Sequence, residues 1–361
     1  MANRLQQFLP QLIHPDQTAC IPGRTINDNI RLIQDAINYA NEIQAPLAVI
    51  LVDQLKAFDR VSHDYLLTVL RHFGFGPSFL RWIRLLYTNT MSSVKVNGWL
   101  TAFIPIQRGL RQGCALSMPL YILTAEILAL YIRFNINIKG LSYPKSMVKI
   151  TQYADDTTLF LADDASILET FKTFDLSEQA SGAKINLHKC KGLWSGSFIH
   201  RTDTPTNFNW YNDQLPDKIL GLYVGNNDCT MKNIEHKINT IKHTIAAWKH
   251  RDLSLRGRAL VINGLLTSTL WFHVTNISIP DWAITEIETL IYAFLWNNKI
   301  PQLNGDTLLL PLAEGGLNIP RIALKICALR VNTLRRLLTA DQVHWKYFTA
   351  YFLRLHNIPY P

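Results

Sequence analysis

Residues 147–163 read MVKITQYADDTTLFLAD, two short apolar runs separated by Tyr153-Ala154-Asp155-Asp156. This pattern predicts a strand–turn–strand hairpin with a buried body and two adjacent carboxylates at its tip. Carboxylates held together at neutral pH repel each other, so one stays protonated unless a cation lies between them. Two Mg²⁺ ions, with Mn²⁺ as a substitute, are the usual solution when the chemistry is phosphoryl transfer.

A second acidic strand end lies roughly a hundred residues upstream, where the apolar run 47–52 ends at Asp53. Successive side chains of a strand point to opposite faces, so Asp155 and Asp156 cannot both face one metal without help from the turn. We therefore predict that Asp53 and Asp155 hold the ions jointly and that Asp156 is more peripheral. A plain polar turn is the alternative, and it is the commoner explanation for two turn aspartates taken alone.

Composition and charge limit the class of protein. The 361 residues can bury a large core and should form more than one domain. The net charge of +9 suggests a polyanionic partner, and residues 232–361 hold 15 Lys and Arg against 8 Asp and Glu, a net +7. Five scattered cysteines without a C-x-x-C pair favour a reducing compartment, nucleus or cytoplasm, over secretion. Charges interrupt the apolar runs, which argues against a membrane span.

Hydrophobic periodicity and turn residues predict the order of elements. The sequence predicts a helix that starts at Ser62 or Asp64 and ends at residue 73, a break at residues 74–77, and a second helix that follows to about residue 87. It also predicts helices over residues 26–43, 117–133, 165–181, 232–250, 254–274, 281–297 and 321–340. It predicts strands over residues 47–52, 184–194 and 219–224, and a hairpin around Asn97-Gly98. Residues 201–217 are predicted to be a loop. The pattern becomes almost wholly helical after residue 232, so we place a domain boundary near residue 225.

Six segments in order resemble the reverse transcriptase of non-LTR (LINE-type) retrotransposons. They are QTACIPGRTINDN (17–29), DQLKAFDRV (53–61), RGLRQGCALSMPL (108–120), YADD (153–156), SGAKINLHKCK (181–191) and ILGLYVG (219–225). The resemblance continues more weakly through residues 248–260 and 315–320. YADD alone would be a weak signal, whereas six motifs in order are a strong one.

The resemblance implies an α+β fold, a right-hand polymerase palm in which helices back an antiparallel sheet. Residues 1–225 would form the palm with partial fingers, because the match begins just after the family's first finger motifs. Residues 226–361 would form a helical thumb and connection region. The implied enzyme is an RNA-directed DNA polymerase that adds dNTPs to the 3′-hydroxyl of a DNA primer on an RNA template, with Asp53, Asp155 and Asp156 as catalytic and metal-binding residues.

The resemblance also assigns residues around the incoming nucleotide. Phe58 would be the steric gate that clashes with a ribose 2′-hydroxyl, although a lone Phe is more often a core residue. Gln112 would orient the template–nucleotide pair, and Gly113 would let that pair approach the backbone closely. Arg108 and Arg111 would contact phosphate. A capped helix start with solvated arginines explains this last segment equally well.

Further basic residues are candidates for contacts with phosphate. Lys184, with Lys189 and Lys191 as alternatives, would neutralise or protonate the leaving pyrophosphate. Arg24 would contact template or nucleotide phosphate. In the basic last third, the residues predicted to bind an RNA–DNA duplex through its phosphates are Lys249, Arg251, Arg256 and Arg258. For any single one of these residues, an ordinary solvated position is the simpler explanation.

Two other functions remain open at this level. The chain could be a catalytically impaired retrotransposon relic that only binds RNA or an RNA–DNA hybrid, since Leu55, Ala115 and Met118 replace residues that are common in the family. An intron-encoded maturase is the second alternative. We expect no membrane partner, and the sequence does not indicate an oligomeric state.

Overall fold

The computed structural model describes residues 1–144, 146–212, 218–339 and 343–358. The chain forms two compact units, residues 1–215 together with 342–360, and residues 216–341. The sequence predicts the boundary near residue 225 instead. The segment before α8 joins the second unit because Asn233 holds it: Tyr223 N donates to Asn233 Oδ1 at 2.9 Å, and Asn233 Nδ2 donates to Tyr223 O at 2.9 Å.

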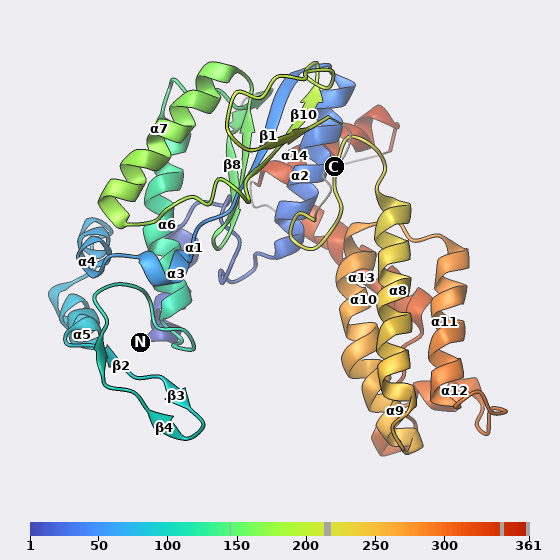
Figure 1. Cartoon of the computed structure of the whole chain (residues 1–361). Coiled ribbons are helices and arrows are strands. Elements are labelled where there is room, and N and C mark those ends of the chain that lie inside the picture. Colours follow the sequence, from blue (N-terminus) through green and yellow to red (C-terminus); the bar gives the residue numbers. More distant parts are fainter. Residues whose placement is uncertain (145, 213–217, 340–342, 359–361) are drawn as a thin grey trace. The chain divides into compact units, whose positions relative to one another are not determined.

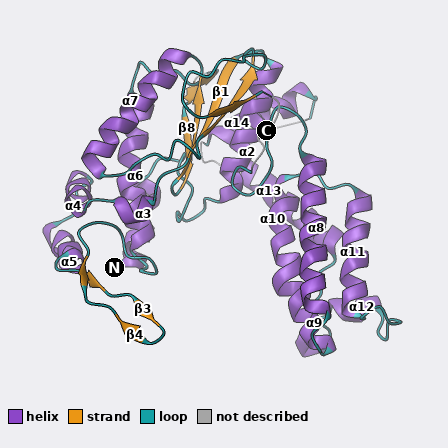
Figure 2. Cartoon of the chain, in the orientation of Figure 1, coloured by secondary structure: helices purple, strands orange, loops and turns teal. Residues whose placement is uncertain are grey.

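A five-stranded sheet forms the centre of the first unit, with strand order β11-β10-β1-β9-β8 (Figures 1 and 2). The central strand β1 is antiparallel to β9 and to β10, and only β11 runs parallel to its neighbour. The hairpin predicted from the YADD segment is the pair β8–β9. The strands are β1 (Pro46–Val52), β8 (Ile150–Tyr153), β9 (Asp156–Leu161), β10 (Lys191–Gly196) and β11 (Asn209–Tyr211).

Alternate residues of β1 bury opposite faces of the sheet, which is why its sequence is continuously apolar. Ala48, Ile50 and Val52 pack in one cluster with side chains of α6 and α7. Helix α2 contacts β1, β8 and β10. The helices of this unit are α1 (Ala2–Leu12), α2 (Ile26–Glu42), α3 (Ala57–Arg60), α4 (His63–His72), α5 (Pro77–Tyr87), α6 (Ser117–Phe134), α7 (Asp164–Ser181) and α14 (His344–Leu355).

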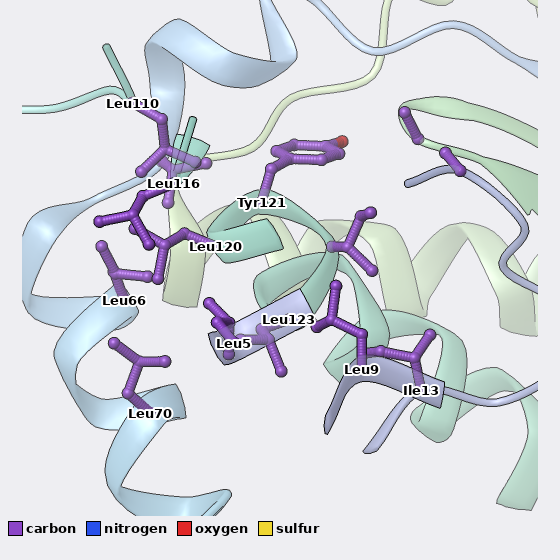
Figure 3. Close-up of a cluster of buried hydrophobic side chains, with 14 of the residues drawn as sticks. Leu5, Leu9, Ile13, Leu66, Leu70, Leu110, Leu116, Leu120, Tyr121 and Leu123 are labelled. Atoms are coloured by element: carbon purple, nitrogen blue, oxygen red, sulfur yellow. The ribbon is translucent and has the colours of Figure 1, made fainter. Parts of the chain in front are cut away.

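A second cluster of buried side chains joins α1, α4 and α6, as Figure 3 shows. Leu5 and Leu9 of α1 lie in it together with Leu66 of α4 and Leu123 of α6. Helix α6 is long and apolar enough to cross a membrane by composition alone. Its apolar side chains are instead mostly buried within the first unit, and this burial accounts for its hydrophobicity.

Short strands form three further two-stranded sheets in the first unit. Asn97 and Gly98 both have positive φ, +48° and +91°, as the two central residues of a type I′ hairpin turn require. The hairpin predicted around them is therefore confirmed. The strands are β2 (Met91–Ser92), β3 (Lys95–Val96), β4 (Trp99–Leu100), β5 (Ile104–Pro105), β6 (Leu141–Tyr143) and β7 (Ser146–Val148), with β2 paired to β5, β3 to β4 and β6 to β7.

Helix α14 has no counterpart among the predicted elements and belongs to the first unit rather than to the helical one. It packs on α2, where the ring of Tyr39 contacts Phe348 and Tyr351 with centroids 5.1 and 4.8 Å apart. Thr349 Oγ1 also donates to Asp35 Oδ2 at 2.7 Å. Aromatic packing over a long sequence separation therefore places α14 beside α2.

The second unit is helical, as the sequence predicts. Helix α8 contacts α11, and α10 contacts α13. The predicted helix 254–274 contains a π-helical segment, η1, between α9 and α10. The elements are α8 (Thr230–Lys249), α9 (Leu255–Val261), η1 (Ile262–Thr267), α10 (Ser268–Asn276), α11 (Asp281–Leu295), α12 (Gly305–Leu309), η2 (Leu312–Glu314) and α13 (Ile322–Leu337).

Three predicted segments differ in detail from the structure. Residues 219–224 form a tight turn and not a strand, because Leu220 and Gly221 have positive φ (+48° and +91°) and Ile219 pairs with Leu222. In the segment 184–194 the strand begins only at Lys191. The predicted loop 201–217 contains β11, and its residues 213–217 lie outside the described part of the chain.

Candidate active site

The end of β1 meets the tip of the β8–β9 hairpin. Val52 pairs with Thr157 in the antiparallel register, so the next residue, Asp53, lies opposite Asp156. Asp156 in turn pairs with Tyr153 across the hairpin, and Asp155 lies in the turn between them. Neighbouring strands are about 4.8 Å apart. The carboxylate of Asp53 and those of Asp155 and Asp156, about a hundred residues later in the sequence, therefore share one edge of the sheet, at the ends of the strands.

The charges of these carboxylates act on each other. The pKa of Asp156 rises to about 6 because neighbouring atoms reduce its hydration and because the negative charges of Asp155 and Asp53 disfavour its ionised form. Burial, with Asp155 and Asp156 adding to it, also raises the pKa of Tyr121. Asp156 is thus coupled to both other acids, and its predicted peripheral position stays a prediction.

The residues fit a divalent cation in their chemistry. Carboxylate oxygens are the ligands that Mg²⁺ prefers, and a cation among them would remove the repulsion that raises the pKa of Asp156. Within the described ranges, no three His, Cys, Asp or Glu side chains are already gathered closely enough to form a metal site. In the described part of the chain, Asp53, Asp155 and Asp156 thus lie at the same edge of the sheet, but their side chains are not arranged as a complete set of metal ligands.

Gln17 holds the turn that carries Asp155, a role that the sequence analysis did not assign. Its buried side chain accepts a hydrogen bond from Ala154 N at 2.9 Å and donates one to Ala154 O at 3.2 Å. Ala154 has φ +57°, an unusual conformation for a residue other than glycine. The flanking backbone pairs with β8, since Gln152 N donates to Asp16 O and Thr18 N donates to Gln152 O.

Phe58 lies beside the acidic edge and stacks on Tyr121 of α6, with ring centroids 4.3 Å apart and planes 23° apart. The hydroxyl of Tyr121 donates to Gln54 Oε1, one residue after Asp53. This chain of contacts fixes the aromatic ring next to the carboxylates, where the resemblance places a nucleotide pocket. Phe58 is only partly buried, so its ring is both packed and accessible.

Residues 108–112 border a cleft of ≈ 830 Å³ whose lining also includes Asp59. Gln112 Nε2 donates to Asp59 Oδ1 at 3.5 Å, and Arg111 donates to Leu86 O at 2.8 Å. Gly109 has φ +93°, and a Cβ on it would approach Asp59 O to 2.8 Å. Because Gly109 has no Cβ, its backbone can lie against the backbone of Asp59. The predicted approach of the template–nucleotide pair to Gly113 stays a prediction.

The basic residues predicted to contact phosphate in the first unit have different partners in the structure. Lys189 Nζ lies 4.0 Å from Asp53 Oδ2, whereas Lys184 Nζ lies 3.4 Å from Glu178 Oε1. Lys189 therefore places positive charge beside Asp53, and the choice among Lys184, Lys189 and Lys191 stays a prediction. Arg24 donates to the carbonyl oxygens of Pro10, Ile13, His14 and Gln17. Its guanidinium holds the backbone that leads to Gln17, and the phosphate contact of Arg24 stays a prediction.

The basic residues predicted to bind a duplex all lie in the second unit. Lys249 and Arg256 are exposed. The Arg251 guanidinium lies 4.3 Å from the Trp248 ring centroid, and Arg258 donates to Leu295 O at 3.3 Å. Arg251 and Arg258 therefore also stabilise the helical unit, and the contact of these residues with nucleic acid stays a prediction.

Comparisons with known proteins identify the family of the chain. A family model described as reverse transcriptase (RNA-dependent DNA polymerase) matches residues 1–224. The Transposon TX1 uncharacterized 149 kDa protein of Xenopus laevis is 34% identical over 364 residues, which cover 99% of this chain and 28% of that protein. A Pol polyprotein from the R2 retrotransposable element of Popillia japonica is 29% identical over 43% of this chain and 25% of that protein.

The fold resembles that of telomerase from Candida tropicalis, solved in complex with a fragment of telomeric RNA. The TM-score is 0.53 at 10% identity, over 99% of this chain and 56% of that one, and such a likeness shows the fold alone. The chain belongs to the reverse transcriptase family. The predicted palm-type α+β fold and the resemblance to non-LTR retrotransposon proteins are confirmed. Reverse transcriptases generally use divalent metal ions.

Proposed function

We propose that this chain carries out RNA-templated DNA synthesis, adding deoxynucleotides to a primer 3′-hydroxyl. The observation that supports this most directly is the meeting of Asp53 with Asp155 and Asp156 at one edge of the sheet, through the register of β1, β9 and β8. The chain spans about a quarter of the two curated relatives that it resembles, so template, primer and dNTPs are part of the proposal.

Asp53, Asp155 and Asp156 would hold two Mg²⁺ ions, with Mn²⁺ as a substitute. When bound, such ions lower the pKa of an attacking hydroxyl and stabilise the charge of the leaving pyrophosphate. Gln17 would keep the Asp155 turn in place, and Lys189 would offer positive charge beside Asp53. Phe58, held by Tyr121, would contact the sugar of the incoming nucleotide and disfavour a 2′-hydroxyl.

Primer extension on an RNA template tests this proposal. We expect the wild-type chain to extend a DNA primer with Mg²⁺ and dNTPs, and Asp155→Asn to lower the rate at least about 100-fold, because a ligand to the ions is lost. Asp175→Asn, a matched change at an exposed position of α7, should extend like the wild type.

Thermal unfolding tests the binding of Mg²⁺ by a measurement that does not depend on activity. Mg²⁺ should raise the midpoint of the wild type and of Asp175→Asn more than that of Asp155→Asn, because a ligand that binds the folded state stabilises it. If the wild type binds an RNA–DNA hybrid but neither extends the primer nor responds to Mg²⁺, the chain is a binding relic and the catalytic proposal is wrong.

A further inference from the structure

The segment between the first acidic motif and helix α6 has an unusual charge pattern. Residues 65–125 contain six basic side chains and no Asp or Glu. All six are exposed in the structure: Arg71, Arg81, Arg84, Lys95, Arg108 and Arg111. A region of one sign over this length attracts polyanions and repels basic surfaces. Its most exposed part, α5 with the ribbon of residues 91–105, is called here the α5–hairpin surface.

Large aromatic side chains on this surface are left in solvent. The exposed fraction is 83% for Trp99, 67% for Phe103 and 57% for Trp82. Trp99 pairs with Val96 across the hairpin, while Lys95 pairs with Leu100. Directly paired residues lie on one face of a ribbon and their neighbours on the other. The ribbon therefore presents an aromatic face and a face that carries a lysine, and in Figure 1 it extends away from α4 and α5.

The base of the ribbon opens into the cleft of ≈ 830 Å³ beside the candidate active site. Met91 and Pro105 line the cleft from the ribbon, and Arg108 and Gln112 line it from the segment before α6. Asp59, one residue after Phe58, also lines this cleft. The α5–hairpin surface is thus continuous with the region proposed to hold the incoming nucleotide.

Exposed aromatic rings together with basic side chains are the features with which proteins bind single-stranded nucleic acid, because bases stack on the rings while the cations contact the phosphates. On this surface the rings are Trp82, Trp99 and Phe103, and the cations are Arg81, Arg84 and Lys95, of which Lys95 lies on the ribbon face opposite Trp99. We infer that the α5–hairpin surface holds the single-stranded part of the RNA template that has not yet been copied. This inference rests on the proposed function, since it assigns the path of the template to that same site. Because its sign of charge is uniform, the surface suits a polyanion better than a protein of mixed charge.

Binding of two primer–template duplexes tests the inference. One duplex is blunt at the template 5′ end, and the other carries an RNA overhang of about 15 nucleotides, near the upper site size of a single-strand-binding fold. Fluorescence anisotropy without dNTPs gives both affinities. We expect the overhang to tighten binding to the wild type, and Trp99→Ala or Phe103→Ala to weaken binding to the overhang form about fivefold or more while leaving the blunt form unchanged.

Three controls separate stacking from other effects. Trp99→Phe keeps an aromatic ring and should retain most of the gain from the overhang. Trp282→Ala and Phe134→Ala remove exposed aromatic side chains from α11 and α6, outside the α5–hairpin surface, and should bind both duplexes like the wild type. Because Trp99 and Phe103 are exposed, their alanine variants should keep the thermal midpoint of the wild type.

The inference is overturned if Trp99→Ala and Phe103→Ala keep the full gain from the overhang. It is equally overturned if these variants bind RNA normally but change the sedimentation of the chain, since the surface would then be a protein interface. Binding is measured without catalysis, so the result separates this inference from the proposed function. If the wild type gains affinity from the overhang but does not extend primers, and Trp99→Ala loses that gain in affinity, only the catalytic proposal is contradicted.

Discussion

At the scale of single residues, the backbone of Ala154 determines where the two adjacent carboxylates point. Its positive φ is sterically unfavourable for a residue with a Cβ, and the cost must be offset by contacts that hold the turn. The Gln17 amide supplies them, since it bonds both backbone polar groups of Ala154 and accepts a third bond from Ala19 N at 3.0 Å. Gln17 is therefore a positioning residue for Asp155 and Asp156.

Gln17→Met tests this role because methionine keeps the volume and removes the hydrogen bonds. We expect the free energy of unfolding to fall by about 1–3 kcal/mol, as for a buried polar group that loses its partner. The rate of primer extension at saturating dNTP should fall about tenfold or more, since a small displacement of catalytic groups is costly. Urea unfolding and steady-state extension measure the two effects.

Gln11→Met is the matched control, because Gln11 is exposed near the end of α1. It should change neither the free energy of unfolding nor the rate. A Gln17→Met variant that is less stable but extends primers at the normal rate per folded molecule would show that Gln17 serves only stability.

At the scale of elements, Asp16 links helix α14 to strand β8, which leads into the YADD turn. His344 Nε2, at the start of α14, lies 3.1 Å from Asp16 Oδ1, while Arg133 Nη1 lies 3.4 Å from Asp16 Oδ2. Burial alone would raise the pKa of Asp16, but contacts with His14 and His344 outweigh it and hold the pKa well below its ordinary value. The backbone carbonyl of Asp16 accepts from Gln152 N at 2.8 Å, so Asp16 joins α14, through its side chain, to β8, through its backbone.

We predict that this carboxylate makes stability depend on acid pH. Because its pKa is lower in the folded state, its stabilisation is present above about pH 4 and is lost as the pH falls below that value. Asp16→Asn should lower the free energy of unfolding at pH 7 by about 3 kcal/mol, the cost of breaking a buried ion pair. The difference from the wild type should shrink toward pH 2.

Urea unfolding at pH 7, 5, 4 and 3 checks this prediction, with Asp175→Asn as the control for an exposed aspartate. An Asp16→Asn variant whose stability falls with acid as steeply as that of the wild type would assign the pH dependence to other carboxyl groups.

At the scale of the whole molecule, positive charge is spread over both compact units. Residues 232–361 carry a net +7 of the total +9, and residues 65–125 add a basic segment within the first unit. The duplex contacts proposed for Lys249, Arg251, Arg256 and Arg258 would release counterions from nucleic acid, which makes affinity depend steeply on salt.

Neutralising a residue that contacts phosphate should therefore lower the salt dependence as well as the affinity. We expect Arg256→Gln to reduce the slope of log affinity against log salt for a blunt RNA–DNA hybrid by about 1. Lys242→Gln is the control, since Lys242 Nζ already lies 2.7 Å from Glu286 Oε1. Equal slopes for Arg256→Gln and the wild type would remove Arg256 from the proposed duplex contact.

Much of the architecture could be predicted because it depends on local patterns. Helix α2, strand β1 and the turn at Asn97-Gly98 follow from periodicity and turn chemistry within a few residues. Helix α14 and the boundary between the units could not be predicted, because they depend on Tyr39, Asp16 and Asn233 contacting residues far away or in an irregular segment. Local patterns in one sequence carry no information about which distant residues come into contact.

For the candidate site the same distinction applies. The residue order alone was enough to single out Asp53, Asp155 and Asp156, because acids at the ends of apolar strands stand out from their surroundings. Only the folded chain revealed that Gln17 holds the turn, that Lys189 Nζ lies 4.0 Å from Asp53 Oδ2, and that Arg24 bonds backbone carbonyls. Side-chain partners depend on distances in space, and a hydrogen bond between residues 17 and 154 leaves no periodic trace along the chain.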